Sequence, residues 1–253
     1  MKGKFLMADG LDGVGKGEVI KAIADFEKSR NKNVFDVNEF WGVDLDKIPN
    51  NDFNPRLEDF KGYDILITSE PTYAGIGRRV RAEYIKKNGR DYDPHVIANG
   101  YALDRFELYT TTIIPAREKG IDVIQSRGVI TSLVYQLLDT KDRSSHGASL
   151  DELMNIPGNK FTLEKDNIPT LLIIPTVDDV DELVKRLDGR SKKDDAIYES
   201  INFQKRLKDS YTNSNLREIF ESRGTIVRYI DAGISVESTR KQAVDLWKEH
   251  IGL

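Results

Sequence analysis

The sequence of 253 residues contains no cysteine and only three histidines. Without cysteine, disulfide bonds and thiolate metal sites are excluded, and such a composition suits a reducing environment. The histidines, His95, His146 and His250, are too far apart in the sequence to suggest a metal-binding motif. We therefore give them no catalytic role.

Long hydrophobic runs are also missing. No apolar run approaches the roughly 18 residues that would span a bilayer, and the amino-terminal run is too short for a signal peptide. The formal net charge is -4, so the chain offers no general attraction to nucleic acid or to an anionic membrane. These absences favour a cytoplasmic protein that binds neither a nucleic acid nor a membrane.

The composition is that of a folded globular chain, with 39% hydrophobic and 32% charged residues. Its length suits one α/β domain with insertions better than two independent domains. Two stretches, about 39–62 and 140–168, are rich in Pro, Asn, Asp or Gly and are predicted to be insertions. We expect a single domain over residues 1–253.

Apolar runs bounded by turn residues alternate with longer helical patterns, which is typical of βαβ units around a mostly parallel sheet. The candidate strands are Lys4–Ala8, Asn33–Val37, Asp64–Thr68, Ile121–Gln125, Thr170–Pro175 and Thr225–Ile230. The expected helices are Gly17–Ser29, Gly75–Lys87, Pro94–Lys119, Ile130–Leu138, Val177–Leu187, Ser200–Ser222 and Val236–Ile251. The fold class is therefore α/β.

A glycine-rich segment, GLDGVGKG at 10–17, lies between the first strand and the first helix. It contains the G-x-x-x-x-G-K part of a phosphate-binding loop. Glycines let the backbone N–H groups turn inward around a phosphate, and the start of the helix adds its positive end. Lys16 would reach the terminal phosphates of a bound nucleotide. The residues predicted to bind ATP in this loop are Gly10, Asp12, Gly13, Val14, Gly15, Lys16 and Gly17.

This motif in its strand-and-helix context predicts a P-loop NTPase fold of three layers. We expect a mostly parallel five-stranded sheet flanked by helices. One letter departs from the motif, because the position after the lysine normally carries a Ser or Thr whose hydroxyl binds Mg²⁺, and here it is Gly17.

Further segments resemble the thymidylate kinase family of P-loop nucleoside-monophosphate kinases. The loop is similar to that family's E-G-x-D-G-x-G-K-[ST] form, with Asp9 in place of the glutamate and Asp12 at the inner carboxylate. The other segments are SEPT at 69–72, GRRVR at 77–81, YALDR at 101–105, SRG at 126–128, YQ at 135–136 and KRLDGRSKK at 185–193. They resemble the family's R-E-P-G-G-T segment, its arginine-bearing helix, F-x-A-D-R, D-R-[YH], Y-Q and its arginine-rich lid.

The resemblance implies a site for a pyrimidine deoxynucleoside monophosphate. Asp12 would contact the 3′-hydroxyl of the sugar, and Arg81 would grip the acceptor phosphate. Tyr101 would stack on the base while Arg105, one helical turn away, would donate to a base oxygen. The full set predicted to bind the acceptor is Asp12, Glu70, Arg81, Tyr101, Arg105, Arg127, Tyr135 and Gln136.

The resemblance also implies the catalytic groups, which are Lys16, Arg127, Arg190 and Asp12. Arg127 would bridge the donor and acceptor phosphates. Because position 14 is a valine and supplies no charge, Arg186 or Arg190 would stabilise the transition state from a mobile lid at about 185–197, which closes over ATP and excludes water. The family also implies a homodimer formed through helices.

Two departures from the family concern magnesium. Gly17 and Ser126 stand where P-loop enzymes carry a hydroxyl and a carboxylate ligand. Mg²⁺ is still expected as a cofactor, because it retains several waters and is often bound mainly through substrate phosphates. Asp9 is at most a substitute ligand. A third departure is Ser69, which replaces an arginine of the acceptor site.

The leading hypothesis is transfer of the γ-phosphoryl group of ATP to thymidylate. Other open hypotheses are a kinase for deoxyuridylate, deoxycytidylate or a nucleoside, and a nucleotide-binding protein without kinase activity. Nucleic-acid binding is a weaker hypothesis, because the basic residues do not form a stripe with aromatic residues.

Overall fold

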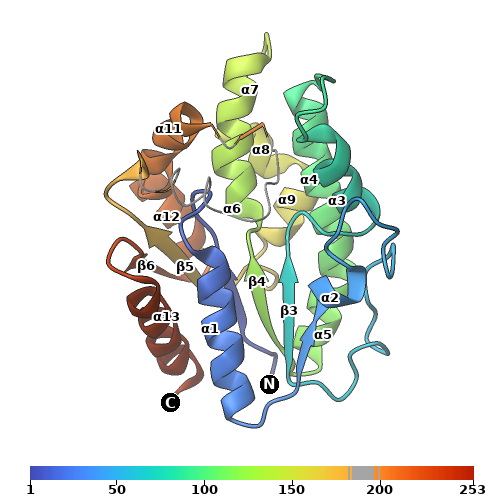
Figure 1. The fold of residues 1–253 in the computed structure, drawn as a ribbon, viewed down its shortest axis with the longest axis vertical. Coiled ribbons are helices and arrows are strands. Elements are labelled where there is room, and N and C mark those ends of the chain that lie inside the picture. The colour runs from blue at the N-terminus through green and yellow to red at the C-terminus, as the bar shows by residue number, and fades with distance from the viewer. Residues whose placement is uncertain (182, 184–196, 199) are drawn as a thin grey trace.

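The computed structural model describes residues 1–181, 183, 197–198 and 200–253. A parallel sheet lies at its centre with helices on both faces (Figure 1). The strands are β1 (Phe5–Ala8), β2 (Val34–Asp36), β3 (Ile65–Ser69), β4 (Asp122–Ser126), β5 (Leu171–Thr176) and β6 (Ile226–Asp231). Their order across the sheet is β2-β3-β4-β1-β5-β6, and every pairing in the described part is parallel.

The predicted α/β class and parallel sheet are confirmed, but the expected number of five strands was wrong. All six candidate strands join one sheet. The additional strand is β6, which pairs along β5 from Leu171↔Ile226 to Thr176↔Asp231. This pairing satisfies backbone groups at the edge of β5 that would otherwise have no partner in the sheet.

The helices before β4 are α1 (Lys16–Ser29), α2 (Val37–Trp41), α3 (Gly75–Arg79), α4 (Pro94–Leu108) and α5 (Ile114–Glu118), with π-helical turns η1 (Val80–Tyr84) and η2 (Tyr109–Ile113). After β4 come α6 (Val129–Thr131), η3 (Ser132–Gln136), α7 (Leu137–Arg143), α8 (Leu150–Asn155) and α9 (Pro157–Thr162). The last are α11 (Ile201–Tyr211), α12 (Ser214–Glu221) and α13 (Val236–Ile251). No helix in the described ranges is long and apolar enough to cross a membrane.

Several helices expected to be continuous are interrupted. Gly75–Lys87 and Ile130–Leu138 contain the π-helical turns η1 and η3, and two further interruptions have a local cause. The helix predicted over Pro94–Lys119 passes through the π-helical turn η2 just before Pro115, because proline has no N–H to donate to the preceding turn. The helix predicted over Ser200–Ser222 is two helices, since the Asn213 side chain accepts from Asn215 N and starts α12. The helix expected at 177–187 overlaps positions outside the described residues.

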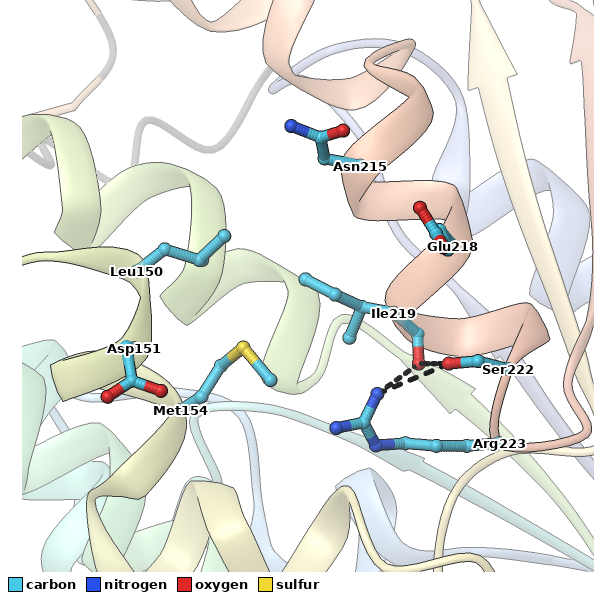
Figure 2. A pocket seen from close by; sticks show the side chains of 8 residues that line it. All are labelled: Leu150, Asp151, Met154, Asn215, Glu218, Ile219, Ser222 and Arg223. Carbon is cyan, nitrogen blue, oxygen red and sulfur yellow. Dashed lines mark hydrogen bonds between the residues drawn. The ribbon is translucent and has the colours of Figure 1, made fainter.

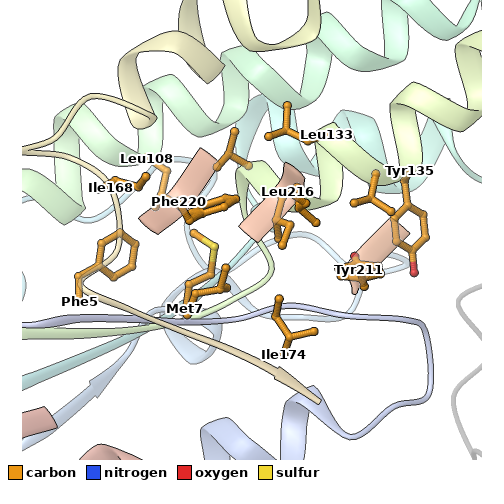
Figure 3. Packing of buried hydrophobic residues seen from close by; sticks show 14 of the residues in the cluster. Phe5, Met7, Leu108, Leu133, Tyr135, Ile168, Ile174, Tyr211, Leu216 and Phe220 are labelled. Carbon is orange, nitrogen blue, oxygen red and sulfur yellow. The ribbon is translucent and has the colours of Figure 1, made fainter. Parts of the chain in front are cut away.

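The alternation of side chains along β1 separates the core into two layers. Leu6 and Ala8 pack with α1 and α13 on one face, where Trp247 is fully buried. Phe5 and Met7 point to the other face. Figure 3 shows this second layer, where strand residues meet Leu133, Leu216 and Phe220 from the covering helices.

The order of the strands decides where a ligand can bind. The chain leaves β1 for β2 at one edge, returns through β3 and β4 to the side of β1, and continues on its other side with β5 and β6. The carboxyl ends of parallel strands around such a reversal form a crevice, which is where ligands bind in open α/β sheets. The glycine-rich loop starts at this end of β1.

Candidate functional site

A cavity of about 750 Å³ opens at the carboxyl ends of the central strands. Its lining comes from the loop and the start of α1, from the segment around β3, and from the ends of β4 and β6. The lining residues are Asp12, Gly13, Gly15, Lys16, Gly17, Glu18, Asn38, Val43, Ser69, Glu70, Tyr73, Arg81, Ser126, Arg127, Ile234, Ser235 and Val236.

The glycine-rich loop has the backbone conformation that its sequence predicts. Gly13 and Gly15 have φ values of 81° and 102°, which residues with a Cβ rarely adopt. Lys16 begins α1, and its Nζ donates to the carbonyl oxygens of Gly10 at 3.0 Å and Leu11 at 2.6 Å. The loop, the helix start and the ammonium group therefore line one wall of the cavity together.

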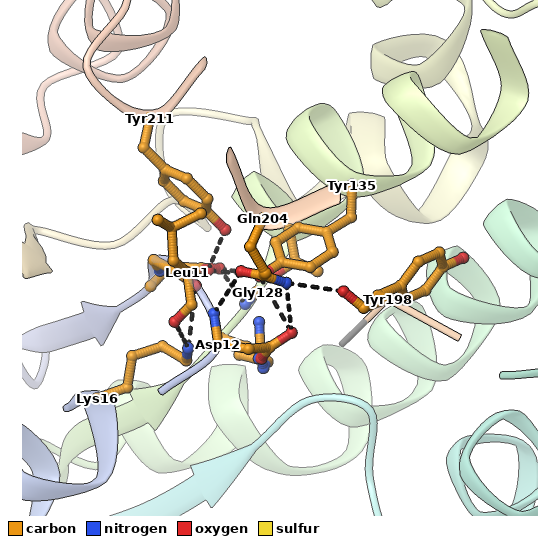
Figure 4. A network of polar contacts seen from close by, with 12 residues as sticks. Leu11, Asp12, Lys16, Gly128, Tyr135, Tyr198, Gln204 and Tyr211 are labelled. Carbon is orange, nitrogen blue, oxygen red and sulfur yellow. Dashed lines mark hydrogen bonds and ion pairs between the residues drawn. The ribbon is translucent and has the colours of Figure 1, made fainter. Parts of the chain in front are cut away.

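Asp12 and Arg127 form an ion pair in the site. Figure 4 shows Asp12 within the surrounding network of polar contacts. The Asp12 carboxylate also accepts from Gln204 Nε2 at 3.0 Å and from the Tyr135 hydroxyl at 3.3 Å. Burial alone would raise the pKa of Asp12, but Arg127 and Lys16 outweigh it and hold that pKa below its ordinary value. Asp12 is therefore a charged acceptor at neutral pH.

Arg127 is held by its backbone as well as by its side chain. Its φ of 64° is left-handed, which is uncommon for a residue with a Cβ. Its N–H donates to Ala8 O at 2.8 Å, and its carbonyl accepts from Gln125 Nε2 at 2.8 Å. The next residue, Gly128, donates its N–H to Asp9 Oδ2 at 3.0 Å. These bonds maintain the turn that directs the guanidinium toward Asp12.

Arg81 on η1 also lines the cavity. Its Nε donates to Pro71 O at 2.8 Å, and its guanidinium lies 4.0 Å from the centre of the Tyr73 ring. Arg81 and Arg127 are therefore two cations that line one cavity, as binding of an anionic phosphate would require. By contrast, Arg78 is occupied with the carbonyls of Leu45 and Lys47.

The carboxylates near the loop are engaged in contacts within the protein. Asp9 is fully buried, and both its oxygens accept hydrogen bonds, from Gly10 N, Gly128 N, Thr131 Oγ1 and the Tyr211 hydroxyl. Glu18 pairs with Arg240 at 2.5 Å. Within the described ranges, no group of three or more His, Asp or Glu side chains is placed to hold a metal. That Asp9 substitutes for a metal ligand stays a prediction.

The comparisons with known proteins identify the family of the chain. The family model described as thymidylate kinase matches residues 56–242. The chain belongs to the thymidylate kinase family. A probable thymidylate kinase from Thermococcus gammatolerans is 28% identical over 98% of each chain. One from Pyrococcus abyssi is 27% identical over 99% of this chain and 98% of the relative.

Other relatives extend the same similarity. A thymidylate kinase from Thermoanaerobacter pseudethanolicus is 25% identical over 99% of this chain and 100% of the relative. The solved structure of thymidylate kinase from Candida albicans matches with a TM-score of 0.64 at 16% identity, covering 99% of this chain and 93% of that one. The last comparison supports the P-loop fold.

Four residues that the thymidylate kinase resemblance assigns to the sugar and base lie outside the cavity lining. Tyr101, Arg105, Tyr135 and Gln136 are all at most 4% exposed. Tyr101 packs with Val80 and Ile97. Tyr135 reaches the site through its hydroxyl, which donates to Asp12, and through its ring, whose centre lies 5.5 Å from the Arg127 guanidinium.

Arg105 belongs to a buried polar cluster. Its guanidinium donates to Glu70 Oε2 at 2.7 Å, to Asn159 Oδ1 and to Gly128 O. Burial raises the pKa of Glu70 to about 7 despite the neighbouring arginine. In this thymidylate kinase family member Arg105 therefore holds β3, α9 and the Arg127 turn together. Asn159 comes from the stretch predicted to be an insertion.

The lid cannot be placed, because Arg186, Arg190 and nearly all of 185–197 fall outside the described residues. Beyond it, sequence reasoning missed Gln204 and Tyr211 of α11, which contact Asp12 and Asp9. It also missed Asn38, which lines the cavity and accepts from Ser69 Oγ at 2.6 Å. Both α11 residues share one helical face, but that spacing alone is equally typical of core positions.

A second hollow of about 480 Å³ lies between α8 and α12 (Figure 2). Leu150, Met154 and Ile219 supply apolar surface, and Arg223 donates to Ile219 O at 2.7 Å. It contains none of the residues that the family resemblance assigns to nucleotides. The cavity at the phosphate loop is therefore the candidate site.

Proposed function

We propose that this protein transfers the γ-phosphoryl group of ATP to thymidylate, giving ADP and thymidine diphosphate. The observation that carries this proposal is one cavity whose lining includes the phosphate loop with Lys16, and also Arg81 and Arg127. The membership in the thymidylate kinase family supports the same reaction.

The donor phosphates would bind along the loop, at the backbone N–H groups from Gly13 to Gly17 and at Lys16. To do so, Lys16 would exchange its bonds to Gly10 O and Leu11 O for phosphate oxygens. The acceptor phosphate would lie between Arg81 and Arg127. An oxygen of that phosphate attacks the γ-phosphorus, and the bond from this phosphorus to the oxygen of ADP breaks.

Catalysis would consist of positioning and charge stabilisation, since the acceptor phosphate is itself the nucleophile. Arg127 would lie close to both phosphates, and Asp12 would accept the 3′-hydroxyl of the sugar. Tyr101, Tyr135 and Gln136 would shape the base and sugar site from the layer beneath the cavity. Arg186 and Arg190 of the lid would complete the charge around the donor.

Magnesium would arrive with ATP and be held mainly by phosphates and water, because the protein's own carboxylates are engaged elsewhere. We also propose that the protein binds small-molecule nucleotides, with ATP as the donor, in the cytoplasm, and that residues 1–253 form one domain.

We further propose a homodimer that buries the outer face of α4. Val96, Leu103 and Phe106 are 47%, 54% and 36% exposed and lie within one stripe of that helix. Light scattering should give the mass of a dimer for the natural chain and of a monomer for Leu103→Glu. A natural chain that is monomeric at high concentration would refute this part of the proposal.

The activity is tested with a coupled assay in which formation of ADP produces a colour change. The reactions contain ATP, Mg²⁺ and one acceptor from the set thymidylate, deoxyuridylate, deoxycytidylate and thymidine. We expect turnover with thymidylate that Lys16→Ala abolishes. Turnover with a different acceptor alone would reassign the substrate. Nucleotide binding by calorimetry without any turnover would leave a binding protein on a kinase fold.

A further inference from the structure

Helix α11 presents two buried polar side chains toward the phosphate loop. Gln204 and Tyr211 are 0% and 2% exposed, although most of their neighbours on this helix are exposed or half-buried. They lie seven positions apart, which is close to two helical turns, so both face the same side of α11. Figure 4 shows both side chains directed at the loop.

Gln204 holds Asp12 at two points. Its Oε1 accepts from Asp12 N at 2.9 Å, and its Nε2 donates to Asp12 Oδ2 at 3.0 Å. The same Nε2 donates to Tyr198 O at 2.9 Å, which fixes the amide orientation. The Asp12 carboxylate is thereby oriented with its other oxygen, Oδ1, toward Arg127.

Tyr211 holds the other carboxylate of the loop. Its hydroxyl donates to Asp9 Oδ1 at 2.9 Å, while Asp9 Oδ2 accepts from Gly128 N at 3.0 Å. Asp9 Oδ1 also accepts from Gly10 N and Thr131 Oγ1, and the Tyr211 hydroxyl is the donor from α11 among the three that fix the orientation in which Asp9 reaches Gly128.

The two contacts converge on Arg127. Its guanidinium pairs with Asp12, which Gln204 orients. Its left-handed backbone leads into Gly128, whose N–H donates to Asp9. Asp9 in turn accepts a hydrogen bond from the Tyr211 hydroxyl, which orients it. Each end of this arginine is therefore connected to α11 through one carboxylate.

We propose that Gln204 and Tyr211 are positioning residues for Arg127, acting through Asp12 and Asp9 respectively. This inference rests on the proposed kinase function, in which Arg127 lies at both phosphates. Neither residue touches the reacting atoms. Their contribution is to keep the guanidinium and its turn in the orientation needed before the nucleotides bind.

The kinetic test compares Gln204→Leu and Tyr211→Phe with the natural chain, and uses Tyr198→Phe as the matched control. The Tyr198 hydroxyl donates to Asp139 at 2.9 Å, away from the loop, so its loss should leave kcat unchanged. We expect kcat to fall by about tenfold to a hundredfold in the two test variants, with KM for ATP changed far less. Test variants whose kcat stays within about twofold of the natural value would overturn the proposal.

Gln204→Glu separates positioning from packing because it keeps the shape. Its ionised carboxylate cannot donate to Asp12 and would repel it, with Arg127 and Tyr135 as the other titratable groups facing it. When protonated, it donates again. We expect kcat relative to the natural chain to recover as pH is lowered from about 8 to about 6, and Gln204→Leu to show no recovery. Equal loss at every pH in both variants would contradict the positioning role.

A second readout does not depend on activity. In protein labelled with ¹⁵N, the Arg127 Nε–H resonance is assigned by its loss in Arg127→Lys, and the Gly128 amide resonance is followed beside it. We expect Gln204→Leu to shift or broaden the first and Tyr211→Phe the second, with no change in Tyr198→Phe. If the natural chain lacked turnover, the kinase function would fail, yet these resonances would still decide the positioning. Unchanged resonances in either variant would overturn it.

Discussion

Ser69 Oγ donates a hydrogen bond of 2.6 Å to Asn38 Oδ1 on the wall of the cavity. Asn38 is itself fixed, because its N–H and its Nδ2 both donate to Asp36 Oδ1 at 2.9 Å. A chain of hydrogen bonds from the Asp36 carboxylate through Asn38 to Ser69, which supplies no positive charge, therefore stands where the family resemblance places an arginine. Attraction of the acceptor phosphate then depends on Arg81 and Arg127.

Ser69→Ala should raise KM for the acceptor by about threefold to tenfold, which is the effect of losing one hydrogen bond, and should leave KM for ATP unchanged. Steady-state kinetics with each substrate varied in turn measures this. Thr68→Val is the matched control, since the Thr68 hydroxyl is buried with no hydrogen-bond partner. A change in KM for ATP instead would place Ser69 on the donor side.

Gly17→Ser should lower the Mg²⁺ concentration needed for half-maximal activity by roughly threefold to tenfold, because it restores an oxygen ligand. A Cβ added at Gly17 would meet no atom within 4 Å, so the substitution requires no rearrangement. Titration of Mg²⁺ at constant ATP gives the value, with Gly17→Ala as control. Equal effects of serine and alanine would mean that this position does not face the metal.

Arg105→Met should destabilise the fold by about 3 to 5 kcal/mol near neutral pH, because it leaves Glu70 buried without its cation. Urea unfolding measures the free energy. Lys21→Met breaks an exposed pair with Asp25 and should cost less than about 1 kcal/mol. Since the pKa of Glu70 is about 7, the loss in Arg105→Met should shrink at lower pH, where Glu70 is neutral. A fully stable Arg105→Met variant would show that the cluster is not structural.

Asp104→Asn should stabilise the protein at neutral pH by up to roughly 3 kcal/mol. Burial raises the pKa of Asp104 from 3.8 to about 6. Its stabilising contribution is therefore complete below about pH 3.8 and is lost as pH rises through about 6. Asparagine stays neutral and keeps the bonding, since its Oδ1 accepts Thr72 N–H and its Nδ2 donates to Thr72 Oγ1, which in turn donates to Ala74 O.

Unfolding free energies measured between about pH 4 and about pH 7 check this prediction. The natural chain should lose stability over this interval relative to Asp104→Asn, and the difference should vanish near the acidic end. A constant difference across the interval would mean that Asp104 does not titrate there.

Local patterns in the sequence were enough to predict the strands and the phosphate loop. A buried strand, a glycine turn and an amphipathic helix such as Val236–Ile251 each leave a signature within a few neighbouring residues. The interruption before Pro115 had a local signal as well, which the helical pattern around it concealed. The number of strands in the sheet had no local signal in the sequence, because an edge strand joins the sheet by pairing with a strand far along the chain.

The sequence by itself determined the fold class, the loop with Lys16 and the family. Only the tertiary structure decided which side chains face the cavity. Arg105 fits a base-reading motif, yet Glu70, Asn159 and Gly128 from three other segments surround it. Gln204 meets Asp12 across 192 positions of the chain. Contacts of this kind arise from the packing of α9 on α4 and of α11 on η3. Hydrophobic periodicity shows that a helix face is buried, but not which distant segment that face meets.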